Sequence, residues 1–216
     1  MSSFRNFYKS LKKYSFFPLL RESYIFMGQL GAKCKWAALS RKEFIMLDLG
    51  SGAKKGENGW TTVDRFGADI NYDLRKDIPL NDDCVSKIYT SHMLEHMPFK
   101  AQIRLIKECR RLLKRGGIFS VCVPNARNYI EAYNSGNFFC DQKLLHSPAV
   151  INTGSLIDQL NYIAYMDGEH HYLFDIENLI NTLKICGFTR VNQREFDPLV
   201  DSADRDFESI YAYAIK

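Results

Sequence analysis

From residue 44 onward, short apolar runs alternate with segments in which apolar side chains recur at helical spacing. The run Phe-Ile-Met-Leu-Asp-Leu at residues 44–49 is followed by Gly-Ser-Gly, which predicts a buried strand that ends in a tight loop. Further strands are predicted at residues 60–64, 68–72, 85–90, 118–123, 189–196 and 209–215, and helices at residues 99–113 and 175–186. This alternation predicts an α/β fold with a largely parallel sheet, in which ligands bind beyond the carboxyl ends of the strands.

Two parts of the chain depart from this alternation. Residues 1–43 predict a helical extension, because apolar side chains recur there at helical spacing and basic side chains occupy the opposite side. The first stripe comprises Phe4, Phe7, Tyr8, Leu11 and Tyr14, and a second helix is predicted at residues 24–39. Residues 127–169 are rich in Asn, Tyr and Ser and have weak periodicity, which predicts a lid or substrate insertion within one α/β domain over residues 44–216.

The charge of the chain is unevenly distributed. Residues 1–43 hold nine basic and two acidic side chains, a net charge of +7, whereas the remainder holds 20 basic and 23 acidic ones, a net charge of −3. A mildly acidic body lacks the basic face that nucleic-acid binding requires, so no nucleic-acid partner is expected. Two roles stay open for the basic extension: it packs over the ligand site, or it makes a weak peripheral contact with anionic lipid.

Neither the cysteines nor the apolar segments indicate secretion or a membrane anchor. The six cysteines form no Cys-x-x-Cys pair, which argues against zinc-finger and thioredoxin-type motifs and is typical of reduced thiols. No apolar run approaches the roughly 18 residues that a membrane span needs. The apolar segment at residues 14–20 contains a proline and is followed by no cleavage site. We therefore expect a cytoplasmic protein, whose oligomeric state the sequence leaves open.

The loop after the first predicted strand favours a cationic ligand. It reads Asp48-Leu-Gly-Ser-Gly-Ala-Lys-Lys55 and lacks the spacing of a phosphate-binding P-loop. A dinucleotide fingerprint is also disfavoured, because Lys55 stands where a small residue is needed and Asp48 would repel a diphosphate. The carboxylate of Asp48 would instead attract a positively charged ligand, although an ordinary glycine turn is also compatible with so short a motif.

The segment Leu47-Asp-Leu-Gly-Ser-Gly52 resembles the first motif of class I S-adenosylmethionine-dependent methyltransferases, in the type-11-like branch. Further matches follow in the family's order: Asp64 at the end of the second strand, residues 73–79, Ser-His-Met-Leu-Glu-His at 91–96, and residues 108–117. The resemblance implies S-adenosylmethionine as the cofactor. It also implies a Rossmann-like sheet, mostly parallel with an antiparallel last strand, and helices on both faces.

The same resemblance implies roles for individual residues. Asp64 would accept hydrogen bonds from the ribose hydroxyls, and Asp73, with the backbone of Leu74, would bind the adenine. The implied cofactor-binding residues are Asp48, Gly50, Ser51, Gly52, Asp64, Arg65, Asp73, Leu74 and Ser91. Two features depart from the family pattern. Lys54 replaces the third loop glycine, and only eleven residues separate Gly52 from Asp64, which leaves little room for a first helix.

The string His92-Met-Leu-Glu95-His96 allows several chemistries. On a helix, His92 and His96 would share a face and bind zinc with Glu95 as general base, as in inverted metallopeptidases, but the position directly after a short strand argues against this. Within the methyltransferase resemblance, His92, Glu95 and His96 are the catalytic candidates. A histidine would act as general base, or the set would hold a divalent cation as in ubiquinone-type O-methyltransferases, or the residues would only brace the next helix.

These observations predict methyl transfer by SN2 displacement from S-adenosylmethionine to a small-molecule acceptor. The aromatic and Asn-rich insertion favours a sugar or another polar metabolite as that acceptor. Because the sulfonium already makes the transfer favourable, catalysis needs mainly alignment of the two reactants. A cofactor-binding protein without turnover is the alternative, and a zinc metallopeptidase is a less favoured one.

Overall fold

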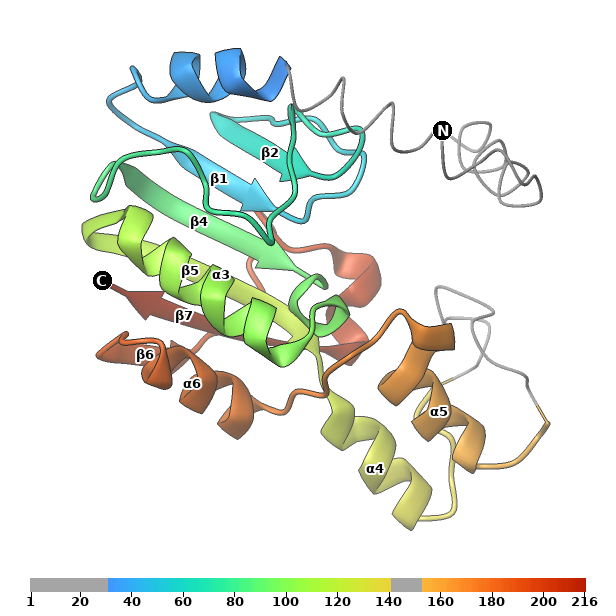
Figure 1. The fold of residues 1–216 in the computed structure, drawn as a ribbon. Helices are drawn as coiled ribbons and strands as arrows, with labels where there is room; N and C mark the ends of the chain where they lie inside the picture. The colour runs from blue at the N-terminus through green and yellow to red at the C-terminus, as the bar shows by residue number, and fades with distance from the viewer. Residues whose placement is uncertain (1–30, 141–152) are drawn as a thin grey trace, which may run out of the picture.

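Seven strands form one sheet in the part of the chain that the computed structural model describes, residues 31–140 and 153–216. The strands are β1 (Met46–Leu49), β2 (Trp60–Asp64), β3 (Ile70–Asn71), β4 (Val85–Ser91), β5 (Leu113–Pro124), β6 (Arg190–Gln193) and β7 (Ser209–Ile215). Their order is β3-β2-β1-β4-β5-β7-β6 (Figure 1), and β7 runs antiparallel to both of its neighbours while the other pairs are parallel. This confirms the predicted sheet and its antiparallel last strand.

Helices accompany the sheet from residue 31 onward. They are residues 31–39, α3 (Phe99–Leu112), α4 (Ala126–Asn134), α5 (Ile157–Tyr165), α6 (Ile176–Ile185) and the 3-10 helices η1 (Leu94–His96), η3 (Met166–Gly168) and η4 (Ala203–Glu208). None of the helices in the described ranges is both long and apolar enough to cross a membrane. Residues 31–39 are helical as predicted, whereas the aromatic stripe at residues 4–14 lies outside the described residues.

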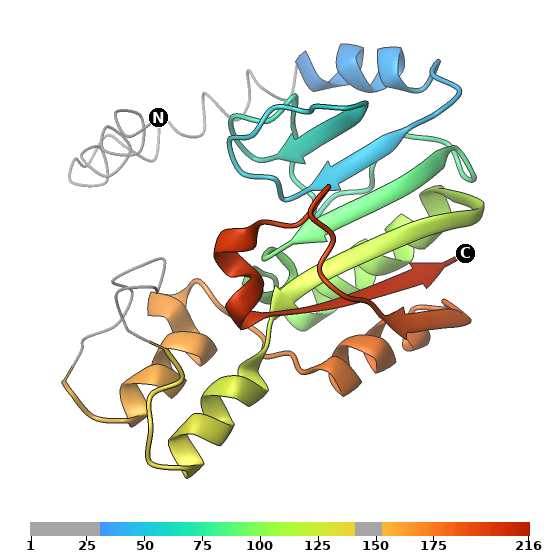
Figure 2. The same cartoon turned by 180° about the vertical axis from the view of Figure 1, so that it is seen from behind.

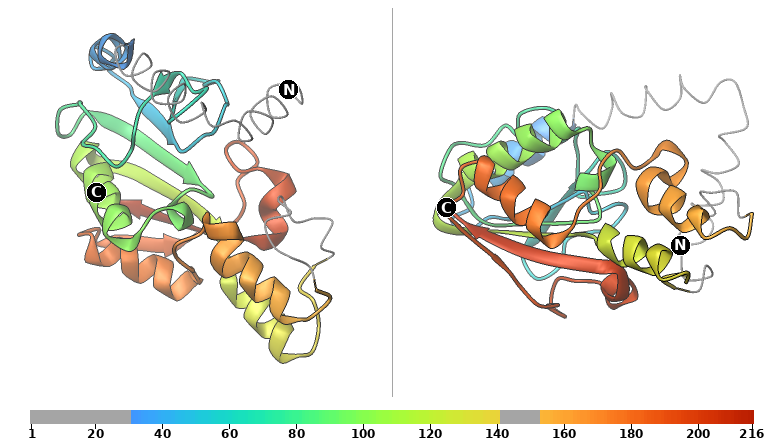
Figure 3. Two further views of the ribbon diagram at one scale, coloured as in Figure 1. Left: turned by 45° about the vertical axis from the view of Figure 1, so that its right-hand side comes forward. Right: turned by 90° about the horizontal axis from the view of Figure 1, so that it is seen from below.

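The main hydrophobic core lies on one side of the sheet. The helix over residues 31–39, α3 and α6 lie on this side (Figure 3), and their apolar residues share one cluster with alternate residues of the strands, such as Leu47, Ile88 and Val121. The strand residues between them, such as Asp48 and Tyr89, face the other side. That side carries η4 and the segment between β6 and β7 (Figure 2).

The links between the first strands are short and contain no helix. No helix interrupts residues 50–59, as the spacing between the glycine loop and Asp64 predicted. Side chains hold this link in place: the Oδ2 atom of Asp69 accepts hydrogen bonds from the backbone N–H groups of Gly56 at 2.9 Å and Thr62 at 3.1 Å. A carboxylate therefore satisfies backbone donors that the turns of a helix would otherwise satisfy.

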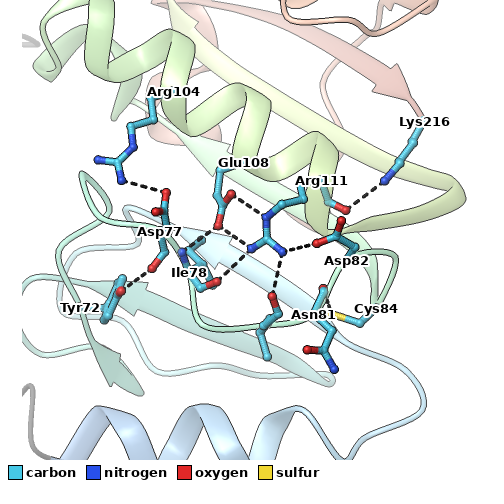
Figure 4. A network of polar contacts seen from close by, with 11 residues as sticks. Tyr72, Asp77, Ile78, Asn81, Asp82, Cys84, Arg104, Glu108, Arg111 and Lys216 are labelled. Carbon is cyan, nitrogen blue, oxygen red and sulfur yellow. Dashed lines mark hydrogen bonds and ion pairs between the residues drawn. The ribbon is translucent and has the colours of Figure 1, made fainter.

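A network of charged groups fastens the link between β3 and β4 to α3 (Figure 4). Glu108 is buried on α3, and its Oε1 accepts hydrogen bonds from the backbone N–H of Ile78 at 2.8 Å and from Arg111 at 2.6 Å. Arg111 also donates to the backbone oxygen of Leu80 at 2.9 Å and forms an ion pair with Asp82 at 2.6 Å. The network replaces regular secondary structure in holding this link against the core.

The main differences from the sequence prediction concern the insertion and the fifth strand. Residues 127–169 were expected to lack strong elements, but α4 and α5 lie within or across the edge of this range. These two helices pack on each other around a small second core of Ala126, Tyr129, Tyr162 and Ile163. They lie beyond the end of β5, away from the main core (Figures 1 and 2). The predicted fifth strand also begins earlier, at Leu113, because this residue pairs with Val85 across an irregularity in β4.

Candidate active site

The glycine loop after β1 is held by the carboxylate at the end of β2. The backbone N–H of Gly52 donates a hydrogen bond to Oδ2 of Asp64 at 2.8 Å. Gly52 has a φ of +67°, and a Cβ added there would meet no atom within 4 Å. The space beside Gly52 is therefore open to a ligand. Both oxygens of Asp64 already accept backbone hydrogen bonds, since Oδ1 accepts from the N–H of Arg65 at 2.5 Å. The structure thus brings together two of the residues that the resemblance implies for the cofactor site.

Gly50 lies against the segment that follows β4. Its φ is +77°, and a Cβ built on it would lie 2.2 Å from Cγ of Met93. A glycine is required here because Met93 occupies the place of any side chain. The contact joins the glycine loop to the His92–His96 segment, so the two predicted parts of the site are neighbours.

Asp48 lies on β1 beside the loop, on the side of the sheet away from the main core. Burial raises the pKa of Asp48 to about 6, an effect that the charge of Lys54 opposes and that of Asp64 reinforces. A cation placed beside Asp48 would favour its ionised form. Ser51, next in the loop, is half-buried, and its hydroxyl donates to the backbone oxygen of Gly52 at 3.4 Å.

The residues expected at the adenine lie after β3. Both carboxylate oxygens of Asp73 accept hydrogen bonds from the side chain of Arg75, at 2.9 and 2.7 Å. These bonds lower the pKa of Asp73 to about 2, so the group is ionised and already paired. Leu74 is buried, and Arg65 is exposed. Ser91, the last residue of β4, pairs with Cys122 of β5.

The His92–His96 segment does not form the helix that a metallopeptidase motif needs. His92 has a φ of +47°, a left-handed conformation that turns the chain sharply out of β4, and only Leu94–His96 forms a 3-10 turn. The two histidines therefore do not share the face of an α-helix. The Nε2 atom of His92 lies 2.8 Å from Oγ of Ser209.

Glu95 is buried at the centre of this segment. Its side chain is 2% exposed, and neither of its carboxylate oxygens has a hydrogen-bond partner among the described residues. Oε1 lies 3.7 Å from Nδ1 of His92 and 3.8 Å from Nε2 of His96. Burial raises the pKa of Glu95 to about 8 and lowers the pKa of His96 below its usual range. The histidine side chains differ in access to solvent, since that of His96 is 36% exposed and that of His92 only 5%.

His170 completes a cluster that the sequence did not pair with Glu95. The backbone N–H of His171 donates to the backbone oxygen of Glu95 at 2.8 Å, which brings the segment after η3 against η1. His170 is buried there, and one potential ligand atom from each of Glu95, His96 and His170 lies within 4.8 Å of the others. His171 is exposed. The sequence places Glu, His and His together at residues 169–171, but only the fold identifies which histidine lies near Glu95.

Comparison with known families agrees with this architecture. Residues 30–121 match a family model described as a methyltransferase domain. The match covers less than half of the chain and includes the glycine loop and the His92–His96 segment. The match agrees with the methyltransferase that the motifs predicted. No curated protein matches the sequence.

Several solved structures are similar to this chain at low sequence identity. A SAM-dependent methyltransferase from Archaeoglobus fulgidus is 16% identical with a TM-score of 0.50, over 94% of this chain and 100% of the other. A possible histamine N-methyltransferase from Thermotoga maritima is 14% identical, with a TM-score of 0.49 and coverage of 89% and 99%. A Haloferax volcanii methyltransferase, solved with the activator Trm112, is 13% identical, with a TM-score of 0.47 and coverage of 90% and 92%. At these identities the Archaeoglobus likeness concerns the fold alone.

Proposed function

We propose that this methyltransferase transfers a methyl group to a hydroxyl of a small polar molecule that binds beside the His92–His96 segment. The contact between Met93 and Gly50 carries the proposal, because it sets this segment directly against the loop predicted to hold the methyl donor. An SN2 transfer requires that the acceptor oxygen lie close to the donor methyl and in line with it. A small molecule between the loop and the segment would meet that condition.

The cofactor would bind along the carboxyl ends of the first three strands. Its ammonium and sulfonium groups would lie near Asp48, its ribose at Asp64 and its adenine at Asp73 and Leu74. The remaining residues of this proposed site are Gly50, Ser51, Gly52, Arg65 and Ser91. The paired carboxylate of Asp73 would accept from the adenine amino group through its remaining lone pairs, with Arg75 in place.

Among the three catalytic candidates, the more exposed side chain of His96 supports a direct contact with the acceptor. Its lowered pKa keeps the ring neutral, so that a lone pair on Nε2 is available for proton transfer from a hydroxyl or for binding an ion. Glu95 and His92 are buried beside it and would position it. The proton of the hydroxyl would leave as the carbon–oxygen bond forms.

The α4–α5 pair (residues 126–134 and 157–165) supports a small polar acceptor. Residues in and beside it leave aromatic side chains exposed, among them Tyr133, Phe138 and Tyr165, with the amides of Asn134 and Asn137 nearby in the sequence. Aromatic faces and amides are suited to binding a sugar or a similar polyhydroxyl compound. A cytoplasmic location, supported by the lack of disulfides among the described cysteines, and the absence of a nucleic-acid partner belong to the same proposal.

The test measures where a labelled methyl group is transferred, so it requires no prior choice of substrate. Purified protein is incubated with S-adenosylmethionine labelled in its methyl group and with a cell extract separated by ultrafiltration into small molecules and macromolecules. We expect label in the small-molecule fraction, with release of S-adenosylhomocysteine. His96→Ala should lower turnover and leave cofactor affinity unchanged, and His171→Ala, a change at the exposed neighbouring histidine, should alter neither.

Two outcomes contradict the proposal. Label found only in the macromolecular fraction would identify a protein or nucleic-acid acceptor. Cofactor binding without label in either fraction would favour a binding protein that lacks turnover.

A further inference from the structure

We propose that Glu95, His96 and His170 form a binding site for a divalent transition-metal ion such as Zn²⁺. The three residues come from two segments far apart in the sequence, and each offers one ligand atom within 4.8 Å of the others. Two imidazoles and one carboxylate are a donor set that suits first-row transition metals and leaves further coordination positions open.

The first argument is the burial of an unpartnered carboxylate. Both oxygens of Glu95 lack a hydrogen-bond partner in the described ranges, although the side chain is only 2% exposed. Burying a carboxyl group without a partner is costly, so native structures pair such a group or place it on a metal. A bound cation would satisfy the group.

The second argument is the orientation of the two imidazoles. Nδ1 of His96 lies 3.0 Å from the backbone oxygen of Glu169, and Nδ1 of His170 lies 2.7 Å from the backbone oxygen of Ile163. A carbonyl oxygen only accepts, so each ring donates its proton from Nδ1 and keeps a lone pair on Nε2. Histidine ligands of metals are typically oriented in this way, with the second nitrogen bonded to a carbonyl or carboxylate.

The distances leave room for an ion. Bonds of about 2.1 Å to a tetrahedral or octahedral ion place neighbouring ligand atoms about 3.0 to 3.4 Å apart. Nε2 of His96 lies 3.8 Å from Oε1 of Glu95, and no two of the three ligand atoms are more than 4.8 Å apart, so small shifts of the side chains would bring them to these distances. His92 lies next to the cluster, with Nδ1 at 3.7 Å from the same oxygen. Mg²⁺ and Ca²⁺ prefer oxygen ligands only, which favours an ion that accepts imidazole nitrogen.

The experiment measures metal binding directly on the full chain, without an affinity tag that contains histidine. Dialysed protein is titrated with Zn²⁺ in competition with a chromophoric chelator, and with Co²⁺, whose visible absorption reports the ligand geometry. We expect one ion per chain, with Mg²⁺ unable to displace it. Glu95→Gln and His170→Ala should each weaken Zn²⁺ binding by about 100-fold or more, since loss of even an outer-shell partner costs about 10- to 100-fold.

His171→Ala is the matched control, because His171 is adjacent to His170 in the sequence but exposed. The Zn²⁺ affinity of this variant should equal that of the unchanged protein. Glu95→Gln keeps the shape of the side chain and removes an unpartnered buried acid, so the metal-free variant should melt no earlier than the unchanged protein. This variant therefore decides the question even if His170→Ala fails to fold. Absence of Zn²⁺ binding, or equal binding by Glu95→Gln, would overturn the site.

These outcomes are independent of methyl transfer, since neither cofactor nor acceptor is present in the titration. A protein that binds Zn²⁺ through Glu95 but labels no small molecule would retain the metal site and lose the proposed function. A protein that transfers the label to a small molecule but binds no Zn²⁺ would retain the proposed function and lose the metal site.

Discussion

The backbone N–H of Gly52 donates to the carboxylate of Asp64 at 2.8 Å, so the end of β2 sets the position of the loop that follows β1. In a longer link between these strands, the first turn of a helix would supply that support. Here the link contains no helix, and the side chain of Asp64 takes its place. In the proposed cofactor site the same carboxylate contacts the ribose, so one residue would serve both the shape of the loop and the binding of the cofactor.

Asp64→Ala should therefore weaken S-adenosylhomocysteine binding by about 1–3 kcal/mol, the range for hydrogen bonds to a charged group. Isothermal titration calorimetry measures the change. Asp204→Ala is the matched control, because Asp204 is an exposed acidic residue on η4. This variant should bind S-adenosylhomocysteine as tightly as the unchanged protein does. An Asp64→Ala variant with full affinity would contradict the ribose assignment.

The two loop glycines should respond differently to alanine. A methyl group at Gly50 would collide with Met93, whereas at Gly52 it would meet no atom within 4 Å, and both residues have positive φ. Gly52→Ala should cost only the conformational strain of about 1–2 kcal/mol in the free energy of unfolding. Gly50→Ala should cost a further 1–3 kcal/mol or so from overpacking, which Met93→Ala in the same chain should largely restore. Urea unfolding measures all three variants, and equal losses at the two glycines would contradict the Met93 contact.

The sequence predicted the bounds of a strand well where polar loop residues flank it on both sides. The strands at residues 60–64 and 209–215 were predicted with the bounds that β2 and β7 have, since β-forming residues are concentrated there and flanking loops are polar. The end of α3 was placed less well. Leu112 and Leu113 are both apolar and buried, so periodicity alone does not show where the helix stops and the strand begins.

The sequence missed contacts that depend on how distant segments meet. The helices α4 and α5 were not predicted because they bury few side chains on each other, which leaves a weak periodic signal. The approach of His170 to Glu95 is accompanied by a backbone hydrogen bond between η1 and the segment after η3. No local pattern encodes that bond. Met93 similarly appears in the sequence as one apolar residue among many, and only the fold shows that it requires Gly50.

Cofactor affinity should depend on pH through Asp48. Burial raises the pKa of this group to about 6, with Lys54 opposing and Asp64 reinforcing the shift. The unliganded protein therefore holds the proton more tightly than the unfolded chain, and its stability should decline as pH rises from about 4 to about 6. A cationic cofactor favours the ionised form, so binding below about pH 6 should release a proton and affinity should rise with pH up to about 6. Calorimetry in two buffers of different ionisation enthalpy counts the proton, and Asp48→Asn should remove both the release and the pH dependence.

Removal of Arg111 should destabilise the fold far more than removal of the nearby Arg104. The carboxylate of Glu108 is buried, and Arg111 is its ion-pair partner at 2.6 Å, whereas Arg104 pairs with Asp77 between side chains that are 52% and 76% exposed. Breaking a buried pair leaves an uncompensated charge, so Arg111→Ala should lower the free energy of unfolding by about 3 kcal/mol. Arg104→Ala should lower it by less than about 1 kcal/mol, as is typical of exposed pairs. Urea titration at neutral pH measures both variants, and comparable losses would mean that Glu108 depends on the N–H of Ile78 rather than on Arg111.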